Sequence, residues 1–524
     1  MYFKQIFLFS LFVVAIDSKK ILVFNPKIGH SHVNFNGKIA DILAERGHDV
    51  HVVTVEMDLD IKYPAAKVAK IYTIQSDPDV TRLLSNNSMK SSMWEMKESV
   101  FAQMELFSDF IEALGIQAKR VIENEALAKW VLSQKFDFAY SEASNVYMIG
   151  LFKAWKIPAY ALGTATPLID AYYPLFGIAF EPSHMPTYMN PYTNKMSFTE
   201  RINNLISYSF TRIFFAYVRD IAGEDLINAK YGAGTFDYDK DLAACSFMFS
   251  NSQPYFELPT PKSGKMLEIG GIGIGEPVPL SDYWIQILNQ RNHTILISFG
   301  SLAKSSKMPK LIKDGIIDTI RQLPDYTFVW KYETPEDGLV PKLDNLILSK
   351  WVPQNDLLNH PNLSLFVSHS GYNSINELAY RGKKTLVVPI FGDQLKNARL
   401  VERAGNGGIM NKKDLANSKI FKRNIVNVIE NKEFDVNAKR LAKILNNRPI
   451  SSKDLLIKHF EFAIEFGNPT MLDLETVNQG FIVYYMLDVL AAIFFTLAFI
   501  IYAIIFVIRF VYRKLFVSLK HKKD

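Results

Sequence analysis

Short apolar runs alternate with helix-like segments at the start of the chain. Lys20–Phe24 has the composition of a buried strand, Val33–Arg46 places apolar residues at helical spacing, and Asp49–Val55 is a second apolar run. Gly47 suits the C-terminal end of the helix. A strand, a helix and a strand joined by short connections form a βαβ unit, which requires a parallel sheet.

The same alternation returns in the second half. Tyr372–Tyr380 reads as a helix that Gly382 ends, and the Gly-rich stretch Ile269–Glu276 separates this half from the first. Short apolar runs of strand length accompany that helix: Thr294–Ser298, Asn345–Ser349, Ser364–Val367 and Thr385–Ile390. At 524 residues the chain is long enough for two domains and extra segments. We therefore predict two α/β domains with parallel sheets.

Both ends carry membrane-related segments. Residues 1–18 combine Lys4 with a short apolar run, which is typical of a secretory signal and too short for an N-terminal anchor. Val489–Ile508 is apolar and uncharged over 20 residues, so we place a transmembrane helix at residues 485–508. A basic tail, residues 509–524, follows. The positive-inside rule then predicts a cytosolic tail, a luminal bulk and a single-pass type I topology.

The charge is concentrated in that tail. The formal net charge is +6, and five of these charges fall in the last sixteen residues. The rest is nearly neutral, so the composition argues against nucleic acid as a partner. Lys520 and Lys522 have the spacing of the dilysine retrieval signal of endoplasmic reticulum membrane proteins. A generic stop-transfer cluster is the alternative interpretation.

The single cysteine, Cys245, excludes an intramolecular disulfide despite the luminal setting. Because its neighbours are apolar, we expect a buried structural thiol rather than a nucleophile. Three sequons, at Asn86, Asn292 and Asn362, are candidate glycosylation sites in that compartment.

Polar and aromatic residues gather at the predicted strand ends of the second half. Ser364–Val367 leads through a polar turn into Tyr372–Tyr380, which sets free N–H groups and a helix dipole at one point, as a phosphate requires. Glu377 follows Asn373 by one turn, where a carboxylate can accept hydrogen bonds from two ribose hydroxyls. Trp351 offers a flat face for a base. This spacing predicts a nucleotide-sugar site that needs no metal.

The order of these residues resembles the signature of the UDP-glycosyltransferases, most closely that of the animal UDP-glucuronosyltransferases. The motifs are Trp351-x-Pro-Gln354, His369-x-Gly371-x-Asn373-x-x-x-Glu377 and Pro389-x-x-x-Asp393-Gln394. The similarity implies that Trp351 stacks on uracil, Gln354 contacts the uridine and Glu377 binds the ribose. It implies further UDP contacts, mostly to the diphosphate, from Ser301, His369, Gly371, Asn373 and Ser374, and sugar contacts from Asp393 and Gln394.

Two positions depart from the family pattern. Ser370 stands where the family usually has Gly, and Lys384 where it usually has Pro. A serine fits most turns that do not need a positive φ, and Lys384 lies in a connection away from the ligand. We therefore expect modest structural effects from both.

The loop Gly29-His30-Ser31-His32 follows the first predicted strand, at the sheet edge where ligands bind in open α/β folds. A His at a helix N-terminus has its cationic form disfavoured by the helix dipole and is available as a base near neutral pH. The family uses one such His to deprotonate the acceptor, and alignment from Arg46 places it at His32, with His30 as the rival. No third residue supports a metal site here.

A base of this kind needs a partner that orients its ring and offsets its charge. The family supplies an Asp in a Phe-Asp-x-x-x-x-Asp context, and here Phe136-Asp137 is followed by Glu142 in that frame. We assign the partner role to Glu142, since the extra methylene still lets it reach the imidazole. The alternative is that Glu142 has no partner and the enzyme is weakened.

The resemblance implies the GT-B fold, with two facing Rossmann-like domains. We place an acceptor-binding domain at residues 19–268, a linker at 269–276, a UDP-sugar-binding domain at 277–449 and a return segment at 450–480. Residues 152–167 and 93–110 are expected to wall the acceptor pocket. Residues 196–217 form either an amphipathic hairpin that touches the bilayer or a plain core helix.

The activity implied is inverting transfer of a sugar from UDP-glucuronate or UDP-glucose to a small lipophilic acceptor, with the UDP-sugar as co-substrate and no cofactor. A second hypothesis is a catalytically lapsed, membrane-anchored nucleotide-sugar binding or scaffold protein. A third is a carrier of lipids or sterols. The choice of donor, the acceptor and the formation of a homo-oligomer stay open at the level of sequence.

Overall fold

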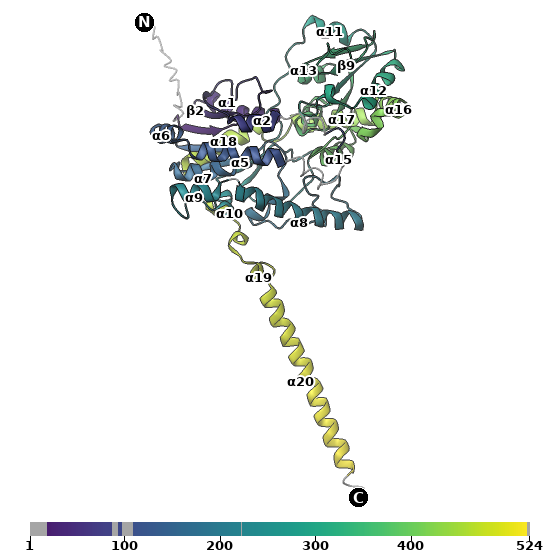
Figure 1. Ribbon diagram of the computed structural model, residues 1–524. Helices are drawn as coiled ribbons and strands as arrows, with labels where there is room; N and C mark the ends of the chain where they lie inside the picture. Colours follow the sequence, from purple (N-terminus) through teal and green to yellow (C-terminus); the bar gives the residue numbers. More distant parts are fainter. Residues whose placement is uncertain (1–17, 86–92, 97–107, 222, 521–524) are drawn as a thin grey trace, which may run out of the picture.

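The computed structural model describes residues 18–85, 93–96, 108–221 and 223–520 (Figure 1). In that part of the chain, two parallel sheets are each covered by helices, and one long helix leaves the globular part. Residues 1–17 of the predicted signal at residues 1–18, the sequon at Asn86 and the last residues of the tail lie outside the described residues.

The first sheet has the strand order β3-β2-β1-β4-β5-β6-β7, and all neighbouring strands are parallel. The interior strand β1 sends Leu22 and Phe24 into one core layer and Ile21 and Val23 into the other, because successive side chains alternate across a sheet. Its strands are β1 (Lys20–Phe24), β2 (Asp49–Glu56), β3 (Lys70–Gln75), β4 (Phe138–Glu142), β5 (Tyr160–Thr164), β6 (Met248–Ser250) and β7 (Met266–Glu268).

Helices cover both faces of this sheet. The helix α1 (His30–Glu45) packs on one face, and α5 (Ser108–Ile122), α6 (Glu125–Gln134) and α7 (Val146–Ala154) pack on the other. The other α-helices in the described residues of the first half are α2 (Pro78–Ser85), α8 (Phe198–Ile221), α9 (Glu224–Tyr231) and α10 (Tyr238–Ala243).

The second sheet has the order β10-β9-β8-β11-β12-β13, again with all neighbouring strands parallel. Its strands are β8 (His293–Ser298), β9 (Tyr326–Lys331), β10 (Leu346–Ser349), β11 (Leu363–Ser368), β12 (Thr385–Val387) and β13 (Gly407–Ile409). Its helices are α11 (Asp282–Leu288), α12 (Lys310–Arg321), α13 (Gln354–Asn359), α14 (Tyr372–Arg381), α15 (Gln394–Ala404), α16 (Ser418–Glu430) and α17 (Lys432–Asn446).

Each core contains side chains from the other half of the chain. The helix α18 (Ser452–Phe466) packs on α1 and β5, and its Leu456, Phe460 and Ala463 are fully buried in the first domain. Conversely, Met93 and Trp94 are buried in the core of the second domain. The prediction that residues 93–110 wall the acceptor pocket is therefore wrong for Met93 and Trp94, and residues 97–107 lie outside the described part.

Two long helices mark the lower side of the globular part in Figure 1. The helix α8 is one continuous helix, not a hairpin. After a short helix, α19 (Phe481–Tyr484), α20 (Leu487–Lys520) extends away from both domains. Its Leu487–Leu515 part is long and apolar enough to cross a membrane, so this candidate span begins near the predicted position and continues past residue 508.

Candidate active site

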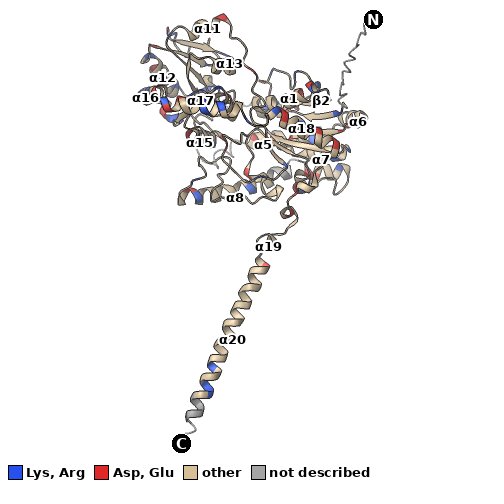
Figure 2. Ribbon diagram, turned by 180° about the vertical axis from the view of Figure 1, so that it is seen from behind, with Lys and Arg blue, Asp and Glu red and all other residues tan. Residues whose placement is uncertain are grey.

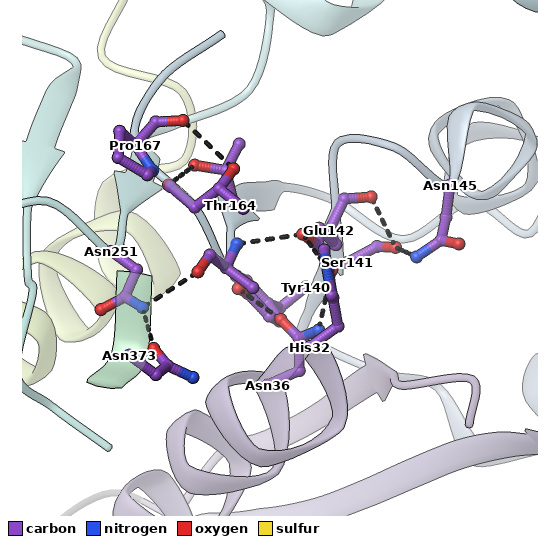
Figure 3. A network of polar contacts seen from close by, with 12 residues as sticks. His32, Asn36, Tyr140, Ser141, Glu142, Asn145, Thr164, Pro167, Asn251 and Asn373 are labelled. Atoms are coloured by element: carbon purple, nitrogen blue, oxygen red, sulfur yellow. Dashed lines mark hydrogen bonds and ion pairs between the residues drawn. The ribbon is translucent and has the colours of Figure 1, made fainter. Parts of the chain in front are cut away.

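The imidazole of His32 and the carboxylate of Glu142 meet at the carboxyl edge of the first sheet. His32 lies in the first turn of α1 and Glu142 is the last residue of β4, so the parallel sheet brings together residues 110 positions apart. The Nδ1 atom of His32 lies 2.8 Å from both carboxylate oxygens of Glu142 (Figure 3). The pairing leaves Nε2 as the ring nitrogen not engaged by Glu142.

Glu142 is held by two further donors. The backbone N–H of Ala165 donates to it at 2.9 Å, and Asn36 Nδ2 donates to it at 3.2 Å (Figure 3). The Oδ1 atom of Asn36 accepts in turn from the hydroxyl of Tyr140 at 2.9 Å. Burial alone would raise the pKa of this carboxyl, but the charge of His32 and these hydrogen bonds outweigh it and lower the pKa. Glu142 is therefore a fixed anion beside the imidazole.

The same pair sets the basicity of His32. Burial works against the imidazolium, yet the charge and hydrogen bond of Glu142, with a smaller contribution from Asp393, raise the pKa of His32. We expected the helix dipole to keep this ring neutral; the carboxylate at 2.8 Å has the larger effect. The rival, His30, lies against Tyr63, with ring centres 5.6 Å apart, and is not the partner of Glu142.

A cleft of about 440 Å³ lies at the carboxyl edge of the second sheet. Trp351 lines it with 65% of its surface exposed, so it is not a core aromatic. Gln354 Nε2 donates to Glu377 at 2.5 Å and to Ser374 Oγ at 3.3 Å. Burial raises the pKa of Glu377 to about 7. Ser301 lines the same cleft, so five of the predicted nucleotide residues surround one space.

His369 follows β11 directly, next to that cleft, and its ring fills a space bounded by two glycines. A Cβ on Gly300 would come within 2.6 Å of Nε2, and one on Gly371 would also clash with it. Burial, aided by the charge of Lys331, lowers the pKa of His369 to about 4. The imidazole is therefore neutral, and it can offer one N–H donor but no charge to a phosphate.

The residues predicted to bind the sugar, Asp393 and Gln394, already make hydrogen bonds within the protein. Asp393 accepts from Asn397 Nδ2 at 2.7 Å, and burial raises the pKa of its carboxyl. Gln394 Oε1 accepts the backbone N–H groups of Ile390 and Phe391 at 2.9 and 3.2 Å. Only the amide nitrogen of Gln394 is left for a ligand, whereas the sequence suggested that the whole amide was available.

Three predictions outside the site have defined surroundings. Cys245 is fully buried and burial raises the pKa of its thiol to about 12, as expected for a structural residue. The sequon side chain of Asn292 is exposed. That of Asn362 donates to Asn289 at 2.7 Å, so a glycan on it would displace this contact.

The family is decided by comparison with known proteins. The family model described as UDP-glucoronosyl and UDP-glucosyl transferase matches residues 19–523. The chain belongs to this UDP-glycosyltransferase family. It is 30% identical to ugt-55 of Caenorhabditis elegans, provisionally named a UDP-glucuronosyltransferase, over 87% of this chain and 89% of the relative. It is 26% identical to UDP-glucuronosyltransferase 1A7 of Rattus norvegicus, over 88% and 87%.

Solved glycosyltransferase structures share the fold of this family member. The kitacinnamycin glycotransferase aligns with a TM-score of 0.53 at 15% identity, covering 85% of this chain and 98% of its own. LpCGTa in complex with UDP aligns with a TM-score of 0.53 at 14% identity, covering 86% and 99%. The GT-B fold and the family resemblance predicted from the sequence are confirmed.

The first departure from the UDP-glycosyltransferase pattern matters more than expected. Ser370 has φ 61°, in the left-handed region that favours glycine, so the expectation that this turn needs no positive φ is wrong. Its buried hydroxyl lies 2.5 Å from the carbonyl oxygen of His369 and 2.9 Å from that of Gln394, between which its one hydrogen is shared, and its own carbonyl accepts from Asn397 at 3.1 Å. These bonds stabilise a backbone conformation that serine adopts at a cost of about 1 kcal/mol or more. Lys384 instead donates to Ile429, away from the cleft.

Two further residues of this UDP-glycosyltransferase reach the site without having been predicted. Asn251 follows β6 and donates to Ala165 O at 2.9 Å and to Asn373 Oδ1 at 2.7 Å, which links the first domain to the predicted diphosphate site (Figure 3). Lys331 ends β9, lines the nucleotide cleft and lies 5.9 Å from the ring centre of Trp351. Both stand at carboxyl ends of strands, and that rule could have found them.

Proposed function

We propose that the protein transfers a hexosyl group from a UDP-sugar to a hydroxyl of a small lipophilic acceptor, with inversion at the anomeric carbon. The observation that supports this most is the His32–Glu142 pair at 2.8 Å, on a network that continues through Ala165 and Asn251 to Asn373. A base on one domain and a predicted leaving-group site on the other are thus connected by hydrogen bonds.

The reaction is a single displacement. His32 Nε2 takes the proton of the acceptor hydroxyl, and the oxygen attacks the anomeric carbon as the bond from that carbon to the UDP oxygen breaks. The positive charge that forms on His32 is offset by Glu142, which is already an anion with a lowered pKa. The electron pair of the broken bond stays on the UDP oxygen, and the negative charge of the departing diphosphate is stabilised at the N-terminus of α14.

The donor would occupy the cleft at the carboxyl edge of the second sheet. Uracil stacks on Trp351, the ribose hydroxyls bond to Glu377, and Gln354 contacts the uridine. Ser301, His369, Gly371, Asn373 and Ser374 surround the diphosphate, while Asp393 and the amide nitrogen of Gln394 face the sugar. The exposed face of Trp351 and the shared cleft support this assignment, and a UDP complex is known for the related fold of LpCGTa.

The setting we propose is the endoplasmic reticulum membrane, with both domains in the lumen, α20 as the single span and the basic tail in the cytosol. The apolar helix and the excess of basic residues beyond it support the topology. A lipophilic acceptor suits an enzyme held at a bilayer, since such molecules partition there.

The lapsed-scaffold hypothesis rested on Glu142 and Lys384. It is disfavoured because Glu142 is within hydrogen-bond distance of His32 and has three donors, which is the arrangement a working pair needs. A pure binder or lipid carrier has no use for an oriented base. The charge at Lys384 is directed to a main-chain carbonyl outside the cleft.

The test is UDP release by microsomes that contain the full chain, supplied separately with UDP-glucuronate and UDP-glucose and with a panel of lipophilic phenols. His32→Ala and Glu142→Ala should reduce turnover by a factor of about 10² or more, while the matched control His30→Ala retains it. Absence of turnover with every donor, together with an increase in thermal stability on adding UDP, would support the lapsed scaffold. Ligand-induced stabilisation by sterols alone would support the carrier.

A further inference from the structure

The outer face of α8 is apolar although the helix lies on the surface. Large apolar side chains are exposed at six positions of this helix, and for Phe198 and Ile213 the exposed fraction is 68%. At 3.6 residues per turn the six positions fall within an arc of about 120°. The six are Phe198, Ile202, Leu205, Ile206, Ile213 and Tyr217, and we call them the apolar stripe.

The inner face of the same helix carries the polar anchors. Asn204 is fully buried; its amide donates to the carbonyl oxygens of Pro182 and Met185 at 2.9 and 2.7 Å and accepts from the backbone N–H of Thr187 at 2.9 Å. A helix on the surface of a soluble protein buries its apolar residues and exposes its polar ones. Here a buried asparagine attaches α8 to the protein while six large apolar residues face outward, so the described part of the chain leaves the stripe largely uncovered.

The position of α8 indicates which partner covers the stripe. In both views α8 runs across the lower edge of the globular part, the side from which α20 leaves (Figures 1 and 2). The residue Tyr485, two positions before α20, is near enough to α8 to act on Tyr208. Burial raises the pKa of Tyr208, and Tyr485 adds to that shift. The start of the membrane span and α8 are therefore neighbours.

The charges around the stripe fit a lipid surface. Arg201 and Arg212 stand beside it on α8, and the guanidinium of Arg201 lies 5.9 Å from the ring centre of Phe198. Arginines flanking an apolar face can reach lipid phosphates while the apolar side chains enter the acyl region, as in helices that lie along a membrane interface.

We propose that α8 lies in the interface of the membrane that α20 crosses, with the apolar stripe against the acyl chains and the buried Asn204 side against the protein. The globular part then has two attachments to the bilayer, one spanning and one lying along the surface. This orientation does not depend on the reaction, and it would hold for a lapsed enzyme as well.

The test uses the full chain with a single reactive cysteine. Because Cys245 is fully buried and burial raises the pKa of its thiol, a fluorescent thiol reagent should label only an introduced cysteine. We would label Ile213→Cys and Leu205→Cys, reconstitute them in bilayer discs, and compare lipids with and without bromine on the acyl chains. The matched control is Leu311→Cys on α12, which is 71% exposed and belongs to the second domain. Phe499→Cys in α20 reports full immersion.

Brominated lipid should quench the probes at positions 213 and 205 roughly twofold or more, approaching the quenching at position 499, because an interfacial helix sits within the boundary of the acyl chains. The probe at position 311 should be unaffected. Quenching at 499 alone would overturn the proposal, since it would mean that water or a second copy of the chain covers the stripe. Equal quenching at 311 would overturn it too, because the signal would then not depend on orientation. An unchanged thermal transition in each variant verifies folding.

Discussion

Shortening the carboxylate partner of His32 is the sharpest perturbation of the proposed reaction. Glu142→Asp installs the residue that the family usually has, so a purely sequence-based argument predicts equal or better activity. The structure predicts the opposite. With β4 fixed, removing one methylene withdraws the carboxylate by about 1.5 Å. Its 2.8 Å contact with His32 then opens to about 4 Å, beyond hydrogen-bond range.

Glu142→Asp should lower kcat by about tenfold to a hundredfold, and Glu142→Gln, which removes the charge altogether, by about 10² to 10⁴. The reaction needs neutral His32, so activity is lost as pH falls through the pKa of His32. Because Glu142 is what raises that pKa, the acidic limb of the kcat/KM profile should move to lower pH in Glu142→Gln.

The assay is initial-rate UDP release across pH, with Asp41→Asn as the control. Asp41 is a buried carboxylate that accepts the backbone N–H groups of Lys67 and Val68 far from His32. Its loss should lower the thermal stability and leave the pH limb in place. Full activity in Glu142→Asp, or an unmoved limb in Glu142→Gln, would refute the assignment of Glu142 as the partner of His32.

Three further outcomes follow from the site. UDP should bind up to about tenfold more weakly at about pH 6 than at about pH 8, because Glu377 has a pKa of about 7 and must be ionised to accept both ribose hydroxyls. Calorimetric titration should show this difference, and in Glu377→Gln the affinity for UDP should no longer change with pH. In Asn251→Ala, Asn373 loses its 2.7 Å hydrogen-bond partner. The Kd of UDP should rise about tenfold and kcat should fall about tenfold, since this is the value of one lost hydrogen bond. Unchanged Kd and kcat would mean that the hydrogen bond between Asn251 and Asn373 does not support the site. UDP-glucose should give a higher kcat/KM than UDP-glucuronate. Glu142 and Asp393 already act on His32 as carboxylates, and a third carboxylate on the sugar would be repelled. A higher kcat/KM for UDP-glucuronate in paired rate measurements would contradict this prediction.

The sequence predicts the parts of the site that local pattern controls. The elements β1, α1 and β2 appear close to their expected positions, and α14 begins at Tyr372 as predicted. Because parallel strands end at one edge, residues that follow different strands converge there without any knowledge of the packing. This is why Trp351, Gln354 and Glu377 are found around one cleft.

What the sequence leaves out depends on contacts between distant segments. The positive φ at Ser370 follows from how the turn meets α15, and a serine in the sequence gives no sign of it. The pKa of His32 depends on its distance to Glu142, and the spacing of the two residues in the sequence does not give that distance. The outward stripe of α8 looks in sequence like any helix with an apolar side, because the pattern does not say which side faces the protein.

The exchange of core residues between the halves bears on how the chain is made. Phe460 completes the core of the first domain, although it is synthesised almost two hundred residues after β7, the last strand of that domain. A domain that emerges first from a ribosome usually folds first. Here the first domain waits for α18, while Trp94 must already be available when the second core closes. The two domains should therefore mature together, late in synthesis, and a chain truncated before α18 should leave both of them dependent on chaperones.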